Sequence, residues 1–150
     1  ASMSQAFVSD KIDGAFLNGG SIRLDDQLHG AITGVDIFRV LPYGGDVLKV
    51  EIKGTLLKRV LDYGVKAAGT GAYLQRYNAE IVDGKWSINN KLLNENKVYK
   101  VAFSDYLLKG FDIPFLSDKN DDVISIYKPL KSEISFDIRK SVISYLKTLQ

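Results

Sequence analysis

An alternating stretch followed directly by a helical stripe constrains the fold of this chain most. Residues 46–53 alternate between apolar and charged side chains, with Leu48, Val50 and Ile52 on one side. A period of two predicts a half-buried β-strand. After Gly54, apolar residues recur at the three-to-four residue spacing of an amphipathic helix: Leu56, Leu57, Val60, Leu61 and Val65. A strand that leads into such a helix predicts a sheet covered by helices.

Further strands are predicted before and after this unit. Residues 12–17 form a short apolar run, and residues 98–103 are apolar on both faces, which favours a central place in the sheet. Residues 73–82 are rich in strand-forming types, and residues 123–127 are predicted to form an edge strand. Asp83-Gly84 predicts a hairpin turn at the end of the 73–82 stretch.

Two more helices are predicted from caps and spacing. Thr33 can cap a short helix over residues 35–41, in which Val35, Phe38 and Leu41 would share a face, and Pro42 would end it. Ser135 is the predicted cap of a last helix over residues 136–149. Residues 89–97 are interpreted as a polar connection. Because strands and helices interleave irregularly and include a hairpin, we expect an α+β fold with a mixed β-sheet covered by helices.

Composition limits both the domain count and the chemistry. A chain of 150 residues that is 45% hydrophobic and 25% charged predicts one domain over residues 1–150. Twenty Lys and Arg against 18 Asp and Glu, scattered along the chain, argue against a nucleic-acid partner. No apolar run approaches the roughly 20 residues of a membrane-spanning helix.

The chain lacks the residues of most catalytic and metal sites. It has no cysteine, and its one histidine, His29, is predicted to lie in a polar loop. Metal centres and Ser-His-Asp arrangements need several converging groups. We therefore expect no catalytic residue, no metal ligand and no cofactor in this chain.

The segment from Asn18 to Arg23 combines an amide, two glycines (Gly19 and Gly20), a hydroxyl and a guanidinium. Glycine allows positive φ and close approach of the backbone to a ligand, and arginine offers a planar fork of donors to phosphate or carboxylate. An anion site at a strand end is one interpretation. A tight turn with a solvated arginine is the other, and the pattern alone leaves both open.

Four blocks together resemble a known family. They are Asn18-Gly19-Gly20-Ser21-Ile22-Arg23, then Gly30-Ala31-Ile32-Thr33, then Val40-Leu41-Pro42-Tyr43-Gly44-Gly45 with the strand to Gly54, and finally Tyr99-Lys100-Val101-Ala102 with Asp105-Tyr106-Leu107 and Gly110-Phe111-Asp112. In order and spacing they resemble the C-terminal domain of the 5′-nucleotidase family. The resemblance covers nearly the whole chain.

The resemblance implies one half of a two-domain enzyme. In that family an N-terminal metallophosphoesterase domain holds two divalent metal ions and performs the hydrolysis, while the C-terminal domain binds the nucleoside part of the substrate. The metal-binding motifs of the catalytic domain are not found in this sequence, so this chain is not expected to hydrolyse a nucleotide alone. Its implied partners are a nucleotide or nucleoside and the metallophosphoesterase domain, and its implied location is the periplasm or the cell surface.

Matching the motifs assigns roles to individual residues. Within the Asn18 to Arg23 block, which includes Gly19 and Gly20, the resemblance implies that Asn18 contacts the base and that Arg23 holds the phosphate. It further implies that Tyr43 and Tyr106 stack on either side of the base and that Asp112 accepts from the ribose hydroxyls. The residues themselves leave another interpretation open, in which Tyr43 packs in a turn and Tyr106 in the core.

The sequence also departs from the family pattern. Where the family has a Gly-Gly-Asp-Gly loop, this chain has Gly110-Phe111-Asp112-Ile113. Two hypotheses therefore remain. The domain binds the nucleoside in the family manner, or it has kept the fold, lost the ligand and become an interaction or structural module.

Overall fold

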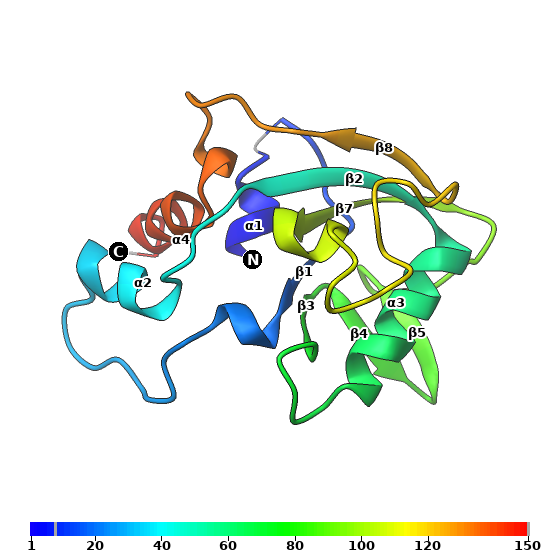
Figure 1. Cartoon of the computed structure of the whole chain (residues 1–150), viewed down its shortest axis with the longest axis horizontal. Helices are drawn as coiled ribbons and strands as arrows, with labels where there is room; N and C mark the ends of the chain where they lie inside the picture. Colours follow the sequence, from blue (N-terminus) through cyan, green and yellow to red (C-terminus); the bar gives the residue numbers. More distant parts are fainter. Residues whose placement is uncertain (8, 150) are drawn as a thin grey trace.

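A mixed five-stranded sheet organises the computed structural model, which describes residues 1–7 and 9–149 (Figure 1). The strand order is β3-β1-β7-β2-β8, and the strands are β1 (Gly14–Asn18), β2 (Val47–Lys53), β3 (Leu74–Tyr77), β7 (Val98–Ser104) and β8 (Val123–Tyr127). Only β1 and β7 pair in parallel, while the other neighbours are antiparallel. The α+β class with a mixed sheet is confirmed, as are the central place of β7 and the edge place of β8.

The remaining elements are short. The helices are α1 (Ser2–Gln5), α2 (Gly34–Val40), α3 (Gly54–Lys66) and α4 (Ile138–Lys147). Three 3-10 turns are η1 (Gly19–Ser21), η2 (Asp105–Leu108) and η3 (Ile134–Phe136). A second, three-stranded sheet contains β4 (Ala79–Val82), β5 (Lys85–Ile88) and β6 (Lys91–Leu92).

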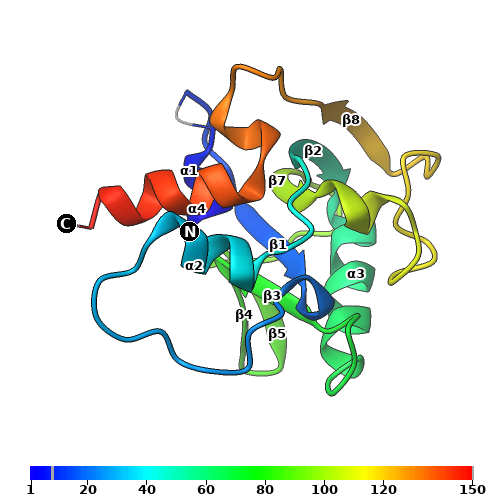
Figure 2. The same cartoon turned by 60° about the vertical axis from the view of Figure 1, so that its left-hand side comes forward.

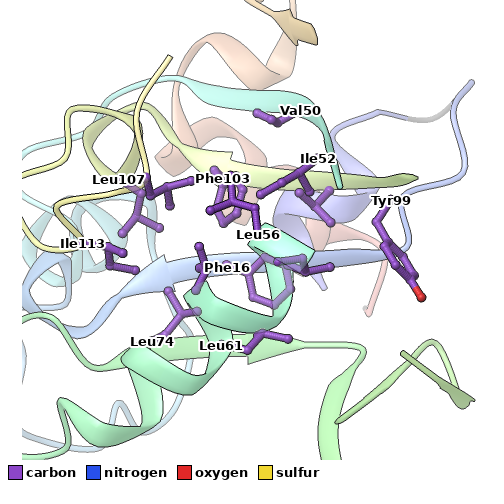
Figure 3. Packing of buried hydrophobic residues seen from close by; sticks show 14 of the residues in the cluster. Phe16, Val50, Ile52, Leu56, Leu61, Leu74, Tyr99, Phe103, Leu107 and Ile113 are labelled. Atoms are coloured by element: carbon purple, nitrogen blue, oxygen red, sulfur yellow. The ribbon is translucent and has the colours of Figure 1, made fainter. Parts of the chain in front are cut away.

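The predicted strand-helix unit of β2 and α3 forms one half of the core. Leu48, Val50 and Ile52 all point to the face that α3 covers, and the apolar stripe of α3 is almost fully buried against them (Figure 3). Phe16 of β1 and Phe103 of β7 join this cluster with ring centroids 5.4 Å apart. Burial of apolar area at about 25 cal/mol per Å² makes this cluster the main source of stability.

A second cluster covers the other face of the sheet. Its buried members come from α1, β1, β2, β7, α4 and the segments that flank them, and they are Met3, Phe7, Ile12, Ala15, Leu41, Val47, Ala102 and Ile138. Figure 2 shows α4 beside α1 and α2 on one side of the molecule, with α3 on the other. With both faces covered, β7 is apolar on both sides, as its sequence indicated.

Two helices differ from prediction in detail. Helix α2 has the Thr33 cap, and Asp36 completes a capping box, but the buried residues are Ile37 and Leu41. The predicted shared face is wrong, because Val35 is 70% exposed and the ring of Phe38 lies 4.3 Å from the Arg139 guanidinium instead.

The cap of α4 is Asp137, whose carboxylate accepts from the Arg139 N–H at 2.9 Å. The predicted cap, Ser135, is wrong, because Ser135 is buried in the separate turn η3. The 3-10 turn delays the start of the helix until Ile138, so a carboxylate that directly precedes the helix makes the cap instead.

The 73–82 stretch is divided by one left-handed residue. Asn78, with φ 58°, separates β3, which pairs with β1, from β4, which belongs to the second sheet. Asp83 and Gly84 both have positive φ, 49° and 73°, as a two-residue hairpin turn of the Asp-Gly type requires. The hairpin is confirmed, whereas the 89–97 connection also contains the short strand β6, which was not predicted.

Gly64 lets α3 pack closely on the sheet. A Cβ atom at this buried helical position would collide with the side chain of Leu74. We expect Gly64→Ala to lower the free energy of unfolding by about 1–3 kcal/mol, although alanine is the better helix former, because overpacking outweighs propensity. Urea denaturation measures this effect.

Gly34→Ala is the matched control. A Cβ atom at Gly34, in the first turn of α2, would meet only the Ile143 side chain at an ordinary 3.8 Å. We expect this variant to be as stable as the wild type or slightly more stable. Equal losses at the two positions would contradict the steric explanation.

Candidate functional site

A cavity of about 460 Å³ lies at the end of the two parallel strands. Because β1 and β7 run in the same direction, the residues that follow them reach the same edge of the sheet. The walls of the cavity include residues of η1, η2, the turn at residues 42–45 and the first residue of α4. Segments that are far apart in the sequence thus form one concave site, which is typical of small-molecule binding.

The cavity gathers all but one of the residues predicted to bind substrate. They are Asn18, Gly20, Arg23, Tyr43, Tyr106 and Asp112. Gly19 does not line it. Neither tyrosine is buried elsewhere, since Tyr43 is 71% exposed and Tyr106 is 38% exposed. The geometry therefore favours a site over the alternative in which these rings are packing residues.

The two glycines serve close packing. Gly19 and Gly20 form a 3-10 turn with no left-handed residue, so positive φ is not the reason for glycine here. Their N–H groups donate to the carbonyls of Tyr73 and Gly71, at 2.6 and 2.8 Å. A Cβ at Gly20 would lie 3.2 Å from the Gly71 Cα. These two N–H groups are already paired within the protein, so they are not free to donate to an anion.

Asn18 is held in one orientation at the end of β1. It is only 4% exposed, and its Oδ1 accepts a 2.6 Å hydrogen bond from the Ser21 hydroxyl. A carboxamide has one acceptor group and one donor group. Since Ser21 uses the acceptor, the NH₂ group is the one left to face the cavity.

Arg23 lies beside Tyr43 at the exposed side of the cavity. Its guanidinium carbon is 5.2 Å from the centre of the Tyr43 ring, and its N–H donates to the Val40 carbonyl at 2.9 Å. Within residues 1–7 and 9–149, no carboxylate lies within salt-bridge distance of Arg23, whereas Arg39 and Arg139 each have an aspartate partner. Arg23 therefore offers a positive charge to an anion.

The altered loop still brings Asp112 to the cavity. Ile113 takes the inward position and is fully buried in the main core, while Phe111 turns outward and is 71% exposed. The Phe111 ring contacts Tyr106, with centroids 5.8 Å apart. Asp112 lies between Phe111 and Ile113 in sequence, and its Oδ2 is buried without a hydrogen-bond partner among the described residues. A buried, unpartnered carboxylate oxygen is suited to accept from a ligand hydroxyl.

Charged side chains surround Gly44 and Gly45, the two glycines of the turn that forms part of the cavity wall. Both glycines have positive φ, 64° and 102°. The Arg139 guanidinium packs against Gly44, and it forms a two-pronged ion pair with Asp137, at 2.9 Å for Nε to Oδ1 and 2.7 Å for Nη2 to Oδ2. Although burial opposes ionisation, these hydrogen bonds lower the pKa of Asp137. This ion pair fixes the start of α4 against the turn that carries Tyr43.

Several lining residues were missed by sequence reasoning. Ser104 ends β7. Asp105 directly precedes Tyr106 in η2, and Lys109 directly follows η2, with the charged atoms of Asp105 and Lys109 3.7 Å apart. The i,i+4 spacing of Asp105 and Lys109 around a candidate aromatic was a signal that could have found them. Ser104 gave no signal, because it only ends an apolar strand.

Neither a metal-binding cluster nor a membrane-spanning helix occurs among the described residues. Within residues 1–7 and 9–149, no group of three or more His, Cys, Asp or Glu side chains could hold a metal ion. His29 is exposed, as predicted for a loop residue. No helix among the described residues has the length and apolar character needed to cross a bilayer.

The family model for the 5′-nucleotidase C-terminal domain matches residues 3–118. The chain belongs to this family. It is similar to the 5′-nucleotidase of Mus musculus, with 32% identity over 121 residues that cover 64% of this chain and 20% of the mouse protein. It is also similar to Protein UshA of Yersinia enterocolitica, with 33% identity over 106 residues that cover 67% of this chain and 19% of that protein.

A solved structure agrees with the fold. The 5′-nucleotidase precursor from Thermus thermophilus matches with a TM-score of 0.78 and 20% identity, over 99% of this chain and 32% of the Thermus chain. At this identity the likeness concerns the fold alone. The chain thus spans about a fifth of the curated relatives, and it corresponds to the C-terminal domain in the family model.

The carboxylates of Asp46, Asp105 and Asp137 near Gly45 predict that stability depends on pH. Burial raises the pKa of Asp46, and the negative charges of Asp105 and Asp137 raise it further. A raised carboxyl pKa in the folded state means that the ionised form destabilises folding, so the penalty is present at neutral pH. We expect Asp46→Asn to raise the Tm by about 2 °C at pH 7, the shift expected for a fraction of a kcal/mol.

The gain should disappear as the pH falls below 3.8, the ordinary pKa of an aspartate, because both states of the wild type then carry the proton. Scanning calorimetry at pH 7 and at acid pH tests this. Asp25→Asn, an exposed carboxyl in a loop, controls for the change in net charge. A gain for Asp46→Asn that persists at acid pH would contradict the electrostatic cause.

Proposed function

We propose that this domain binds the nucleoside part of a nucleotide in the cavity, as the substrate-recognition half of a 5′-nucleotidase-type phosphohydrolase. One observation carries the proposal. Motif residues from three separate segments, each a weak signal alone, converge on one cavity that has a stacking surface, a hydrogen-bonding amide, a carboxylate and an arginine without an acidic partner among the described residues. These are the groups that a nucleotide requires.

Each group matches a part of the ligand. The base stacks between Tyr43 and Tyr106, an interaction worth about 1–3 kcal/mol per base. The NH₂ group of Asn18, oriented by Ser21, donates to the edge of the base. Asp112 accepts from the ribose hydroxyls, and Arg23 binds the phosphate through charge-assisted hydrogen bonds.

Hydrolysis is assigned to the rest of the enzyme. We propose that a metallophosphoesterase domain with two divalent metal ions supplies the activated water, since metal-bound water is the usual nucleophile in such reactions. Arg23 would then hold the phosphate at the side of the cavity that faces this domain. The isolated domain would bind without turnover, and the enzyme would act in the periplasm or at the cell surface, as the family resemblance implies.

The second candidate function is an interaction module. The outward position of Phe111 favours it, since Phe111 is 71% exposed and its ring contacts Tyr106, so the two form an aromatic patch beside the cavity, and contiguous apolar patches mark interaction sites. In that case the cavity residues would have no ligand to bind. The two functions differ in whether nucleotide binding depends on Arg23.

Arg23→Ala tests the proposed function. We expect the wild-type domain to bind AMP weakly and saturably in isothermal titration, and the variant to lose about tenfold in affinity, which corresponds to about 1.4 kcal/mol for a charge-assisted contact. Adenosine lacks the phosphate, so its affinity should stay nearly unchanged in the variant.

Arg39→Ala is the matched control, because Arg39 is paired with Asp36 and its side chain is 68% exposed outside the cavity. It should bind AMP like the wild type. The absence of heat with millimolar AMP and adenosine would reject the proposal and favour the interaction module.

Asp112→Asn tests the contact with the sugar. Asparagine replaces one acceptor oxygen by a donor, so the ribose diol loses a partner. We expect adenosine to bind about five- to tenfold more weakly, the loss of one hydrogen bond to a charged acceptor. With 2′,3′-dideoxyadenosine, wild type and variant should bind alike. Equal losses of affinity for adenosine and 2′,3′-dideoxyadenosine would show that Asp112 does not contact the ribose hydroxyls.

A further inference from the structure

Ser104 carries a buried hydroxyl that the fold itself does not use. The residue is 4% exposed, and its Oγ has no hydrogen-bond partner among the described residues. The hydroxyls of Ser21, which also lines the cavity, and of buried Ser141 differ. Ser21 donates to Asn18 at 2.6 Å, and Ser141 donates to the carbonyls of Ile134 and Asp137 at 3.2 and 3.4 Å. Burying a hydroxyl without a partner is unfavourable, so its presence calls for a reason.

Ser104 lines the cavity, and its register in the sheet shows on which face its hydroxyl lies. Ser104 is opposite Val47 in the antiparallel ladder of β2 and β7, so it points to the same face of the sheet as Val47. The cavity wall on that face is apolar, formed by Leu17, Leu41 and Ile138. The hydroxyl is therefore a polar group in an otherwise apolar part of the wall.

The two ends of the cavity differ in burial, and this orients a bound ring. Arg23 and Tyr43 are exposed, whereas Asn18, Leu41, Ser104 and Ile138 are each at most 5% exposed. A phosphate held by Arg23 stays at the exposed end. A flat ring stacked against the tyrosines then turns its outer edge toward the buried end, where Ser104 provides a polar group.

We infer that Ser104 is a specificity-determining residue, whose hydroxyl forms a hydrogen bond with the edge of the base. This inference rests on the proposed function. A hydroxyl can donate or accept, whereas the Asn18 NH₂ group only donates. Asn18 is paired with Leu74 and lies on the α3 face of the sheet, whereas Ser104 is paired with Val47 on the opposite face, so the two residues contact different parts of the base. A buried site of this kind discriminates strongly, because a base without the matching atom leaves the hydroxyl unpaired.

Ser104→Ala separates a ligand-binding hydroxyl from a structural one. Removing an unpartnered hydroxyl relieves a penalty in the free domain, so we expect the Tm to stay equal or rise by about 1–3 °C. At the same time, the nucleoside that the wild type binds most tightly among adenosine, guanosine, uridine and cytidine should lose about five- to tenfold in affinity in isothermal titration. The differences in affinity among the four nucleosides should become smaller.

Ser141→Ala is the matched control, since Ser141 is also buried, at 2% exposure, but its hydroxyl is paired within the protein. It should lower the Tm and leave the nucleoside preference unchanged.

Four outcomes would overturn the inference. A Ser104→Ala variant with wild-type affinity for all four nucleosides would show that the hydroxyl is not used by the ligand. Equal losses for all four, or a Tm lowered by several degrees, would show a structural role. If the wild type binds none of the four and no AMP, the proposed function fails together with the inference, whereas the first outcomes reject the role of Ser104 alone.

Discussion

The parallel pairing of β1 with β7 is the constraint on which the rest of this structure depends. It aligns Gly14, Ala15 and Phe16 with Val101, Ala102 and Phe103, in two strands that are far apart in the sequence. Parallel neighbours need a long crossover connection, and here that connection contains α2, β2 and α3. The pairing buries Phe16 against Phe103 and also brings the ends of both strands to one edge, so a single interaction creates the core and positions the site.

The cavity wall combines rigid and adaptable parts. Asn18 and Ser104 end buried strands, and the turn that carries Tyr43 is fixed by the ion pair of Arg139 with Asp137. Arg23 and Phe111 are more exposed and lack acidic or core partners among the described residues. The buried end of the cavity is thus formed by packed strand ends, and exposed side chains form its outer side.

The departure from the family loop has a simple structural consequence. Ile113 fills the main core, and the outward turn of Phe111 extends the aromatic surface beside Tyr106. Gly110, with φ 74°, retains the backbone freedom that the turn needs. The two bulky residues therefore point in opposite directions, and Asp112 keeps its place on the cavity wall.

The sequence alone determined the elements whose signals are local. The period of two in β2, the stripe of α3, the Asp-Gly turn and the Thr33 cap each depend on neighbours within a few residues, and all were predicted correctly. The motif resemblance also identified residues that share the cavity, because a family motif carries tertiary information. The buried face of α2, the cap of α4 and the close packing at Gly19 and Gly20 depend on segments that are distant in sequence, such as Arg139 and Gly71. Only the tertiary structure could decide them, and only it could show that the hydroxyl of Ser104 is buried, without a partner among the described residues, in the wall of the cavity.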